Sequence, residues 1–330
     1  MFRRYTLAFL FLLVVCIFAV MGVQAQRRVV IAEWNVENLF DTIDDDRTAD
    51  EAFLPQGEYH WTSGRYWRKL NAMAGVLSAL GGDAGMPAVL GLCEVENDSV
   101  MRDLTRRSAL RTAGYEFVMT KSADHRGVDV VFLYNPNVFR LVSWHPVRVP
   151  SLQHGYSPTR DILYAKGVVP SYDTLHFVLC HLPSKSGSGR SATRHRRLAV
   201  QTLYSIVDSL MNVDPNAKLL VMGDFNASYD EQIFRQLCPP LQETLPTSRQ
   251  ALMRPVGTYY YQRQWSYLDH ILVSPALADW QRSLQHPCAS AEVRLPMLLT
   301  REGTPNRTYK GPFYNGGISD HLPLKMELWY

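Results

Sequence analysis

The sequence predicts an α/β layered sandwich that carries its chemistry along one rim of its sheets. Apolar runs typical of strands alternate with helical patterns, and the strands predominate. Nearly every strand run ends in residues able to do chemistry. The 330 residues are 46% hydrophobic and 20% charged, a composition typical of a globular protein with a sizeable core.

The predicted elements follow in order along the chain. Strands are expected at residues 29–34, 88–93, 128–134, 175–180, 219–222, 268–273 and 324–330. Helical spacing of apolar residues predicts helices at residues 66–80, 101–113 and 194–210. The interior has no linker rich in Pro, Gly and Ser, so we expect one domain covering residues 26–330.

The N-terminus is expected to be a signal peptide covering residues 1–25. Arg3 and Arg4 precede an apolar run at residues 7–23, and small residues follow at the positions that a signal peptidase reads. Cleavage is expected before Gln26, which would release the mature chain into the periplasm or the medium.

Two alternatives exist for this end of the chain. A retained membrane anchor is possible because the apolar run is near the lower limit for a spanning helix. Lipid attachment at Cys16 fits poorly, since the apolar run continues after it. No later stretch is long and apolar enough to span a bilayer. Loss of Arg3 and Arg4 reduces the net charge from +3 to about +1, so any nucleic-acid footprint must be local.

Four cysteines follow the signal segment. Cys93 and Cys180 lie in apolar strand runs, where buried thiols are expected. Cys238 and Cys288 lie in loop-like sequence flanked by prolines, and they are the expected pair if the mature protein has a disulfide.

Six polar clusters carry candidate chemistry. The first contains Asn35, whose amide can ligate a hard metal or orient another ligand. The second contains Glu94, a carboxylate that is costly after an apolar strand unless it is paired or bound to a cation. Oxygen ligands of this kind suit Mg²⁺ or Ca²⁺. Taken singly, a turn-capping asparagine and a glutamate at the solvent end of a strand would explain both residues as well.

The third cluster begins with His181 at the end of a strand. A histidine there could donate to a phosphate oxygen or exchange a proton. Lys185 and the Gly/Ser-rich residues 186–188 follow as a phosphate-facing loop, and Arg194 extends the positive charge into the next helix. A solvated basic face is the alternative interpretation of that helix start.

The fourth cluster is the most informative. Gly223 permits a close backbone approach, and the spacing of Asp224 and Asn226 after an apolar strand predicts that both point to the same side of an extended chain. A carboxylate beside an amide suits positioning an attacking water while an N–H donor holds the phosphate.

The last two clusters are the dipeptides Asp269-His270 and Asp320-His321. Neighbouring residues cannot readily share one face of a strand. We therefore expect Asp320 to reach a metal and His321 to face the substrate, with Asp269 fixing the tautomer of His321. Either dipeptide alone would indicate a solvated turn.

Together these clusters resemble the endonuclease/exonuclease/phosphatase family, which includes DNase I-like nucleases and abasic-site endonucleases. The resemblance runs from about residue 29 to the C-terminus, with matching clusters in the order Asn35, Glu94, His181, residues 223–226, Asp269 and residues 319–321. The segments similar to secreted nuclease-like members are residues 34–41, 126–129, 181–185, 257–259 and 316–321.

The resemblance implies a four-layer αββα sandwich (DNase I-like), with two mixed β-sheets flanked by helices. It also implies a divalent cation, Mg²⁺ or else Ca²⁺ or Mn²⁺, held mainly by Glu94 with Asn35 and Asp320 nearby.

The same resemblance implies roles for the other polar residues. Asp224 would orient or deprotonate water, and Asn226 would contact the phosphate. His321, paired with Asp269, would act as acid–base or transition-state donor, and His181 would support the pentavalent phosphorus. A departure from many relatives, which carry Tyr or Gln there, is His270, with a possible effect on the shape of the pocket.

The predicted function is an exported, metal-dependent phosphodiesterase, with an endonuclease acting on nucleic acid as the leading form. Arg126, Lys185 and Arg194 are the expected substrate-binding cations. The alternative is a phosphatase or phospholipase-type phosphodiesterase acting on lipid head groups or phosphosugars, because one fold serves many substrates. A binding protein that has lost catalysis is the third interpretation.

Substrate choice is expected to depend on aromatic and basic loops at residues 61–67, 259–261 and 307–314, together with Trp265. Stacking on these side chains would favour bases, whereas a sugar platform or core packing explains them equally well. No protein partner and no stable membrane span in the mature chain are predicted.

Overall fold

The computed structural model describes residues 27–150, 158–171, 173–184, 190–237, 240–245 and 257–330. The predicted signal peptide, Lys185 and Cys238 lie outside the described residues. Within the described part of the chain, no helix is long and apolar enough to cross a membrane.

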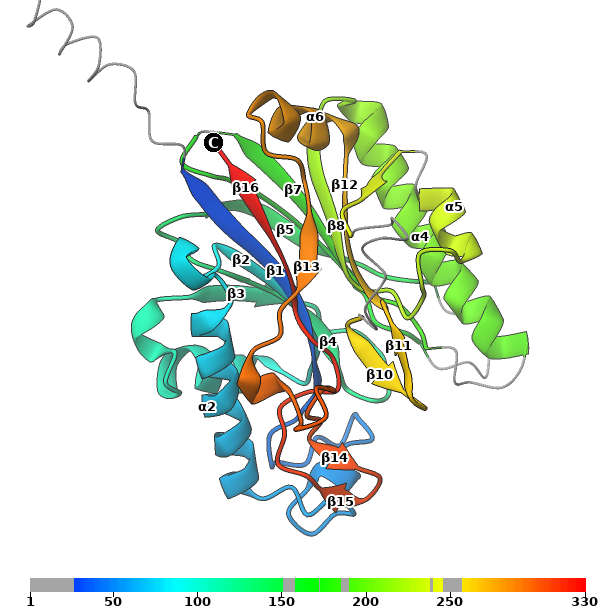
Figure 1. Ribbon diagram of the computed structural model, residues 1–330. Coiled ribbons are helices and arrows are strands. Elements are labelled where there is room, and N and C mark those ends of the chain that lie inside the picture. The colour runs from blue at the N-terminus through cyan, green and yellow to red at the C-terminus, as the bar shows by residue number, and fades with distance from the viewer. Residues whose placement is uncertain (1–26, 151–157, 172, 185–189, 238–239, 246–256) are drawn as a thin grey trace, which may run out of the picture.

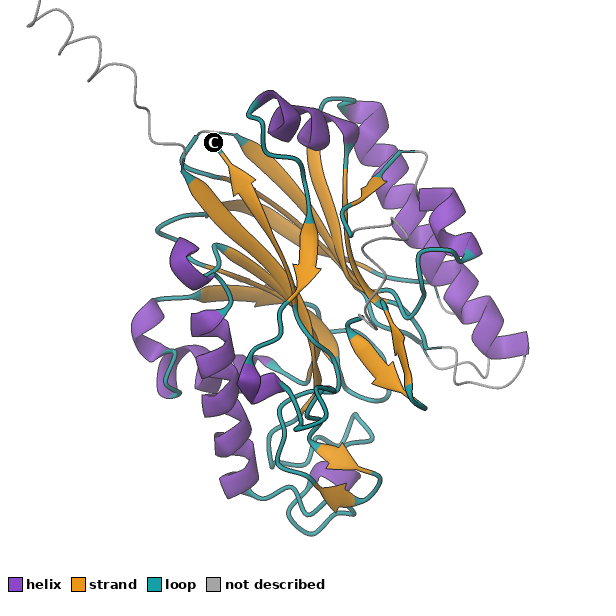
Figure 2. Cartoon of the chain, viewed as in Figure 1, coloured by secondary structure: helices purple, strands orange, loops and turns teal. Residues whose placement is uncertain are grey.

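Two six-stranded sheets pack face to face (Figure 2). The first has the order β13 (Ser290–Glu292), β16 (Leu324–Trp329), β1 (Arg28–Leu39), β2 (Val89–Val95), β4 (Asp129–Tyr134) and β3 (Glu116–Met119). The second has the order β5 (Arg140–Val147), β6 (Ile162–Val168), β7 (Thr174–His181), β8 (Lys218–Asp224), β12 (Asp269–Val273) and β9 (Gln242–Glu243). Both are mixed, since β1 and β2 run parallel, as do β7 and β8, while the other neighbours run antiparallel.

Helices cover the outer faces of both sheets (Figure 1). Helix α2 (Ser63–Ala79) lies on the first sheet, while α4 (Arg190–Val213) and α5 (Gln232–Leu237) lie on the second. Helix α6 (Pro275–Ser283) begins directly after β12. These layers form the four-layer αββα sandwich that the resemblance implied.

Three apolar cores separate the four layers. Trp34 and Leu70 belong to the core between the first sheet and α2, and Leu203 and Val221 to the core between the second sheet and α4. The core between the sheets includes Ile31, Phe132, Phe177, Leu179, Met222 and Ile271. Because strand side chains alternate, Glu33 and Asn35 follow Ile31 on the face of β1 that meets the second sheet.

The predicted helix at residues 101–113 is confirmed only in part, because its helical residues do not form one continuous helix. The chain forms α3 (Asp98–Arg102), a π-helical turn (Asp103–Arg107) and a short 3₁₀ turn (Arg111–Ala113) instead. Ser108 ends the helical run with an extended backbone, and its hydroxyl donates to the carbonyl of Leu104 and accepts from the N–H of Leu110. A serine side chain therefore replaces the next helical hydrogen bonds here.

Two long strands escaped prediction from the sequence. Strand β5 is an edge strand that is mostly exposed and contains Pro146, so its sequence has the pattern of a loop. Strand β6 contains Lys166 and Gly167, which interrupt its apolar pattern. The other predicted strands and helices are confirmed to within a few residues at each end.

Candidate active site

Asp224 lies at the centre of the polar clusters, at the last position of β8. The parallel register of β7 and β8 places His181 beside Asp224, and the antiparallel register of β8 and β12 places Asp269 on its other side. Gly223 makes this pairing possible, because its φ is 137° and a Cβ there would lie 2.0 Å from the carbonyl oxygen of Cys180. The second sheet thus aligns three of the predicted residues at one rim.

The first sheet reaches the same carboxylate through Asn35. Its Nδ2 donates to Asp224 Oδ2 at 3.0 Å, while its Oδ1 accepts the N–H of Glu37 at 3.0 Å. Asn35 is 2% exposed, so this bond is shielded from water. The amide therefore orients Asp224 and joins the two sheets.

His321 and Asp269 form a buried pair. His321 Nδ1 lies 2.7 Å from Asp269 Oδ2, and His321 Nε2 lies 4.0 Å from Asp224 Oδ2. Ser319 Oγ accepts the N–H of His321 and donates to the carbonyl of Asn35, which fixes this segment on β1. Burial opposes protonation, but Asp269 outweighs it and raises the pKa of His321 well above its ordinary value.

Glu94 is held at the end of β2 in a left-handed conformation with φ 67°. Its Oε2 accepts the N–H of Asn38 at 2.8 Å, and its Oε1 lies 3.5 Å from Arg126 Nη2. Burial acts to raise the pKa of Glu94. Arg126 and the Asn38 N–H lower the pKa by more than burial raises it, so the net pKa is below its usual value. The carboxylate is therefore ionised and directed into the site.

His181 lies between two carboxylates. Its Nε2 is 3.7 Å from Asp224 Oδ2 and 3.8 Å from Glu94 Oε1. Burial, with the positive charges of Arg160 and Arg126, lowers the pKa of His181 well below its ordinary value. This histidine is neutral at pH 7.

Asn226 closes the turn after β8. Its backbone N–H donates to Asp224 Oδ1 at 2.7 Å, and its Nδ2 donates to the carbonyl of Leu182 at 2.9 Å. A φ of 48° brings the side chain back toward Asp224, so the chain here is a turn and not the extended strand that sequence spacing suggested. Arg196 supports the turn by donating to the carbonyls of Phe225 and Asn226.

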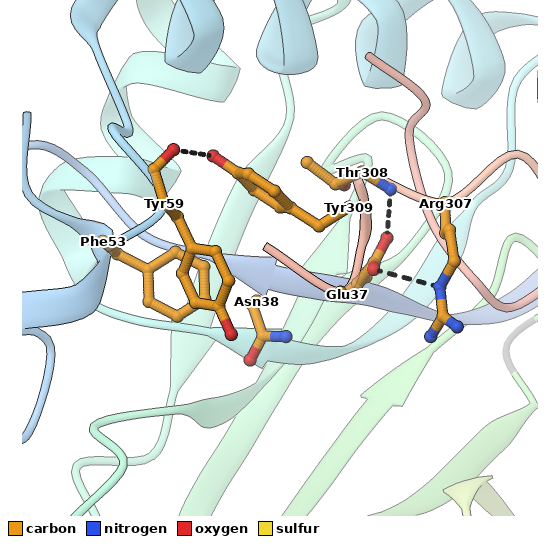
Figure 3. Close-up of a pocket in the computed structure, with 8 residues that line it drawn as sticks. Glu37, Asn38, Phe53, Tyr59, Arg307, Thr308 and Tyr309 are labelled. Carbon is orange, nitrogen blue, oxygen red and sulfur yellow. Dashed lines mark hydrogen bonds and ion pairs between the residues drawn. The ribbon is translucent and has the colours of Figure 1, made fainter. Parts of the chain in front are cut away.

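Asp320 adjoins a second polar cluster, formed by Arg307, Glu37 and Lys69. Its Oδ2 accepts from Arg307 Nη2 at 2.5 Å, and Arg307 Nε lies 3.7 Å from Glu37 Oε1 (Figure 3). Lys69, buried in α2, donates to the carbonyl of Glu37 and to Thr308 Oγ1. Burial and the nearby Asp320 raise the pKa of Glu37 to about 7, while burial lowers the pKa of Lys69 to about 8.

The predicted substrate-binding cations have different positions. Arg126 joins the site through Glu94 and Asn38. Arg194 is exposed on α4, and no hydrogen bond or ion pair joins it to the described residues of the site. Lys185 stays a prediction because it lies outside the described residues.

His270 is buried away from the site. Its Nδ1 lies 2.6 Å from Glu243 Oε2, its Nε2 lies 2.9 Å from the carbonyl of Ala227, and its ring packs on Phe225 and Phe234. It therefore supports the layer between the second sheet and α5 and does not shape a pocket at the rim.

Several residues of this region were missed from the sequence. Alternation along β1 could have identified Glu33, which shares the face of Asn35, whereas Glu37 lies where the backbone is left-handed with φ 53°. Glu33 is fully buried, its oxygens make no hydrogen bond to the described residues, and its burial, with Asp269 and Asp224 nearby, raises its pKa well above the ordinary value. Lys69 and Arg160 gave no local signal, since only the fold brings them to the rim, whereas Arg307 belongs to the basic and aromatic stretch 307–314 that the sequence indicated.

The donor set fits a divalent cation. Burial and Asp269 raise the pKa of Asp224 to about 7, and Asp269 Oδ1 is buried without a hydrogen-bond partner among the described residues. A bound cation would relieve this crowding of carboxylates. Among the described residues, Asp224, Asp269 and His321 have donor atoms within 4.8 Å of one another. Asp269 and His321 are already joined to each other by a 2.7 Å hydrogen bond. Asp224 and the ionised Glu94 are therefore the carboxylates that stay available near a cation.

The chain was compared with known proteins by sequence and by fold. Residues 30–329 match the family model described as "Endonuclease/Exonuclease/phosphatase family". No curated protein matches the chain by sequence.

Several solved structures have a similar fold. A mannosyl-6-phosphatase from Bacteroides thetaiotaomicron is 14% identical, with a TM-score of 0.59 over 92% of this chain and 99% of that chain. The human Nocturnin catalytic domain with bound sulfate is 17% identical, with a TM-score of 0.58 over 93% and 97%. D. rerio TDP2 with a single-strand DNA product is 15% identical, with a TM-score of 0.56 over 92% and 99%. At these identities the likeness shows the fold alone.

Proposed function

Because the chain belongs to the endonuclease/exonuclease/phosphatase family, whose members are phosphoric ester hydrolases, we propose that it hydrolyses a phosphoric ester by attack of water at the rim around Asp224. One observation carries this proposal. Asn35 Nδ2, His181 Nε2 and His321 Nε2, from both sheets and from the chain before β16, lie 3.0, 3.7 and 4.0 Å from the same oxygen, Asp224 Oδ2.

Asp224 is the proposed general base. A carboxylate with a pKa of about 7 is matched to neutral pH, where a base must both lose its proton readily and accept one from water. The attacking water would give its proton to Asp224 while its oxygen bonds to phosphorus and the ester P–O bond breaks. Asn35 would keep the carboxylate turned toward that water.

The two histidines would act in different protonation states. His321 is protonated at neutral pH because Asp269 raises its pKa, so its Nε2–H can donate to a phosphoryl oxygen or to the leaving oxygen. His181 is neutral, so it adds a hydrogen bond without adding charge. Asn226 would complete the donors that face the phosphate, as the sequence predicted.

A divalent cation is proposed to be held mainly by Glu94, with help from Asn35 and Asp320. When bound, it would neutralise charge on the phosphoryl oxygens. Asp320 would then be shared with Arg307, which holds it in place. Oxygen donors of this kind suit Mg²⁺, Ca²⁺ or Mn²⁺.

The finer prediction is an endonuclease acting on nucleic acid. The structure of TDP2 with a single-strand DNA product supports it, because that protein holds a nucleic-acid strand on a similar fold. The alternative, a phosphatase acting on a sugar phosphate, is supported equally by the mannosyl-6-phosphatase of similar fold.

A panel assay tests the proposal. The mature chain would receive plasmid DNA, RNA, sphingomyelin and a phosphomonoester, with Mg²⁺, Ca²⁺ or Mn²⁺ and again with chelator. We expect chelator-sensitive hydrolysis of at least one substrate, lost in Asp224→Asn and His321→Ala and kept in Asp214→Asn, a change on the exposed turn before β8. Hydrolysis that survives chelation, or that survives both active-site changes, would contradict it.

Export is proposed from the sequence of residues 1–25 alone. N-terminal sequencing of the protein recovered from outside the cytoplasm tests it. A chain that starts at Gln26 would support cleavage, and a full-length chain in the membrane fraction would identify a retained anchor.

A further inference from the structure

A pocket of about 240 Å³ opens beside the candidate active site (Figure 3). Its walls come from the end of β1, from the loop around the 3₁₀ turn η1 (Glu51–Phe53), and from the segment entering β14 (Tyr309–Lys310). The lining residues used below are Glu37, Asn38, Phe53, Tyr59, Arg307 and Tyr309.

The pocket and the proposed cation site share residues. Asn38 lines the pocket with its side chain, while its N–H holds Glu94. Arg307 lines the pocket and donates to Asp320. A phosphate held by a cation at Glu94 would therefore lie next to this pocket, and its esterified group would extend into it.

The rings of Phe53, Tyr59 and Tyr309 form one wall of the pocket, and they pack against one another. Phe53 lies between Phe40 and Tyr59, with ring centroids 4.4 and 4.9 Å apart, and Tyr59 lies between Phe53 and Tyr309, which is 4.7 Å away. The hydroxyl of Tyr309 donates to the carbonyl of Tyr59, which fixes the wall. A base that stacks on an aromatic side chain needs an uncovered ring face, and the Tyr59 ring already has a neighbour on each side.

The polar groups that line the pocket can form hydrogen bonds with the hydroxyl groups of a ligand. The hydroxyl of Tyr59 points toward the Asn38 amide (Figure 3), and neither it nor Asn38 Nδ2 has a hydrogen-bond partner among the described residues. Asn38 Oδ1 accepts from Arg126 at 2.9 Å, which fixes the direction of the amide. Opposite them, the Glu37 carboxylate and the Arg307 guanidinium supply acceptors and donors.

We infer that this pocket binds the organic group of the substrate, and that the group is a single sugar ring carrying the scissile phosphate. This inference rests on the proposed function of the adjoining site. The pocket volume of about 240 Å³ supports a single ring, since pockets that bury larger, drug-sized ligands measure roughly 300–1,000 Å³.

The test compares three phosphoric esters: hexose 6-phosphate, ethyl phosphate and a short oligonucleotide. We expect the wild type to prefer hexose 6-phosphate in kcat/KM. Tyr59→Phe keeps the ring wall and removes one hydroxyl, so it should lower kcat/KM for hexose 6-phosphate by roughly 10-fold, the effect of one hydrogen bond. Turnover of ethyl phosphate should not change. Tyr204→Phe is the matched control, since Tyr204 is exposed on α4, outside the pocket.

The inference is overturned if Tyr59→Phe slows hexose 6-phosphate and ethyl phosphate equally, or if the oligonucleotide is preferred and Tyr59→Phe leaves it unaffected. Binding of hexose 6-phosphate by calorimetry separates this inference from the proposed function. If the wild type hydrolyses none of the esters yet binds hexose 6-phosphate more tightly than Tyr59→Phe does, the pocket stands and the proposed reaction fails. If there is neither hydrolysis nor Tyr59-dependent binding, both fail.

Discussion

Asn35 and Asp224 belong to different sheets, yet Asn35 Nδ2 donates to Asp224 Oδ2 at 3.0 Å in the buried rim. Strand β1 stops at this rim with its polar residues turned toward the second sheet. The hydrogen bond therefore couples the packing of the sheets to the orientation of the proposed general base.

Removing this donor should leave a smaller fraction of Asp224 ionised at pH 7. In Asn35→Ala, Asp224 loses a hydrogen bond that favours its ionised form, so its pKa should rise and the acidic limb of the pH–rate profile should move to higher pH. A hydrogen bond to a charged group contributes about 1.5–3 kcal/mol, so we expect a loss of roughly 10-fold or more in kcat at pH 7. Asn216→Ala, on the exposed turn before β8, should leave the profile unchanged. An unshifted acidic limb in Asn35→Ala would show that the bond does not tune Asp224.

Asp269→Asn should move the alkaline limb. Asp269 raises the pKa of His321 against the effect of burial, so activity that needs protonated His321 is lost as pH rises through that raised pKa. In the variant this pKa should fall, and the alkaline limb should shift to lower pH with a loss of roughly 10²-fold or more at pH 8. The control is Glu243→Gln, which alters the other buried histidine–carboxylate pair, at His270. Equal shifts in the two variants would count against a special role for the Asp269–His321 pair.

The residues at strand ends were predictable because their surroundings are local. Glu94, His181 and Asp224 each follow an apolar run and lie at the end of a strand, as the sequence indicated. Asn35 follows such a run too, although β1 continues to Leu39. Gly223 signals a close backbone approach by its type alone, and the structure places it against the carbonyl of Cys180.

The charges that tune these residues were not predictable in the same way. Lys69 lies in the middle of α2, where a lysine indicates a solvated face, yet it is 2% exposed and reaches the carbonyl of Glu37. Arg160 is equally ordinary in sequence, but it donates to Asp124 and to the carbonyl of Leu182. Such contacts join segments far apart in the chain, and no spacing rule encodes them.

Glu94→Gln should raise the requirement for metal. The change removes the ionised carboxylate that Arg126 and the Asn38 N–H hold at the rim, while the amide keeps its size. We expect the Mg²⁺ concentration for half-maximal activity to increase roughly 10-fold or more, in line with the cost of losing support for a metal site. Glu96→Gln is the matched control, because Glu96 lies two residues further along the chain but accepts the N–H of Asp41. A metal requirement that rises equally in both variants would place the cation elsewhere.

Glu96 should also make the stability of the fold depend on pH. Burial, followed by the nearby Asp41 and Asp50, raises the pKa of Glu96 from 4.5 to about 8. Between these values the folded chain binds more protons than the unfolded chain, so the free energy of unfolding should fall as pH rises from about 4.5 to about 8.

Glu96→Gln removes this titration and can keep the acceptor for the Asp41 N–H. The variant should match the wild type near pH 4.5 and exceed its free energy of unfolding by up to on the order of 3 kcal/mol at pH 8. Urea unfolding in chelator at both pH values measures the difference, with Glu58→Gln as the exposed control. A constant gap between variant and wild type across the range would mean that the contact with Asp41, and not the ionisation of Glu96, sets the stability of this corner.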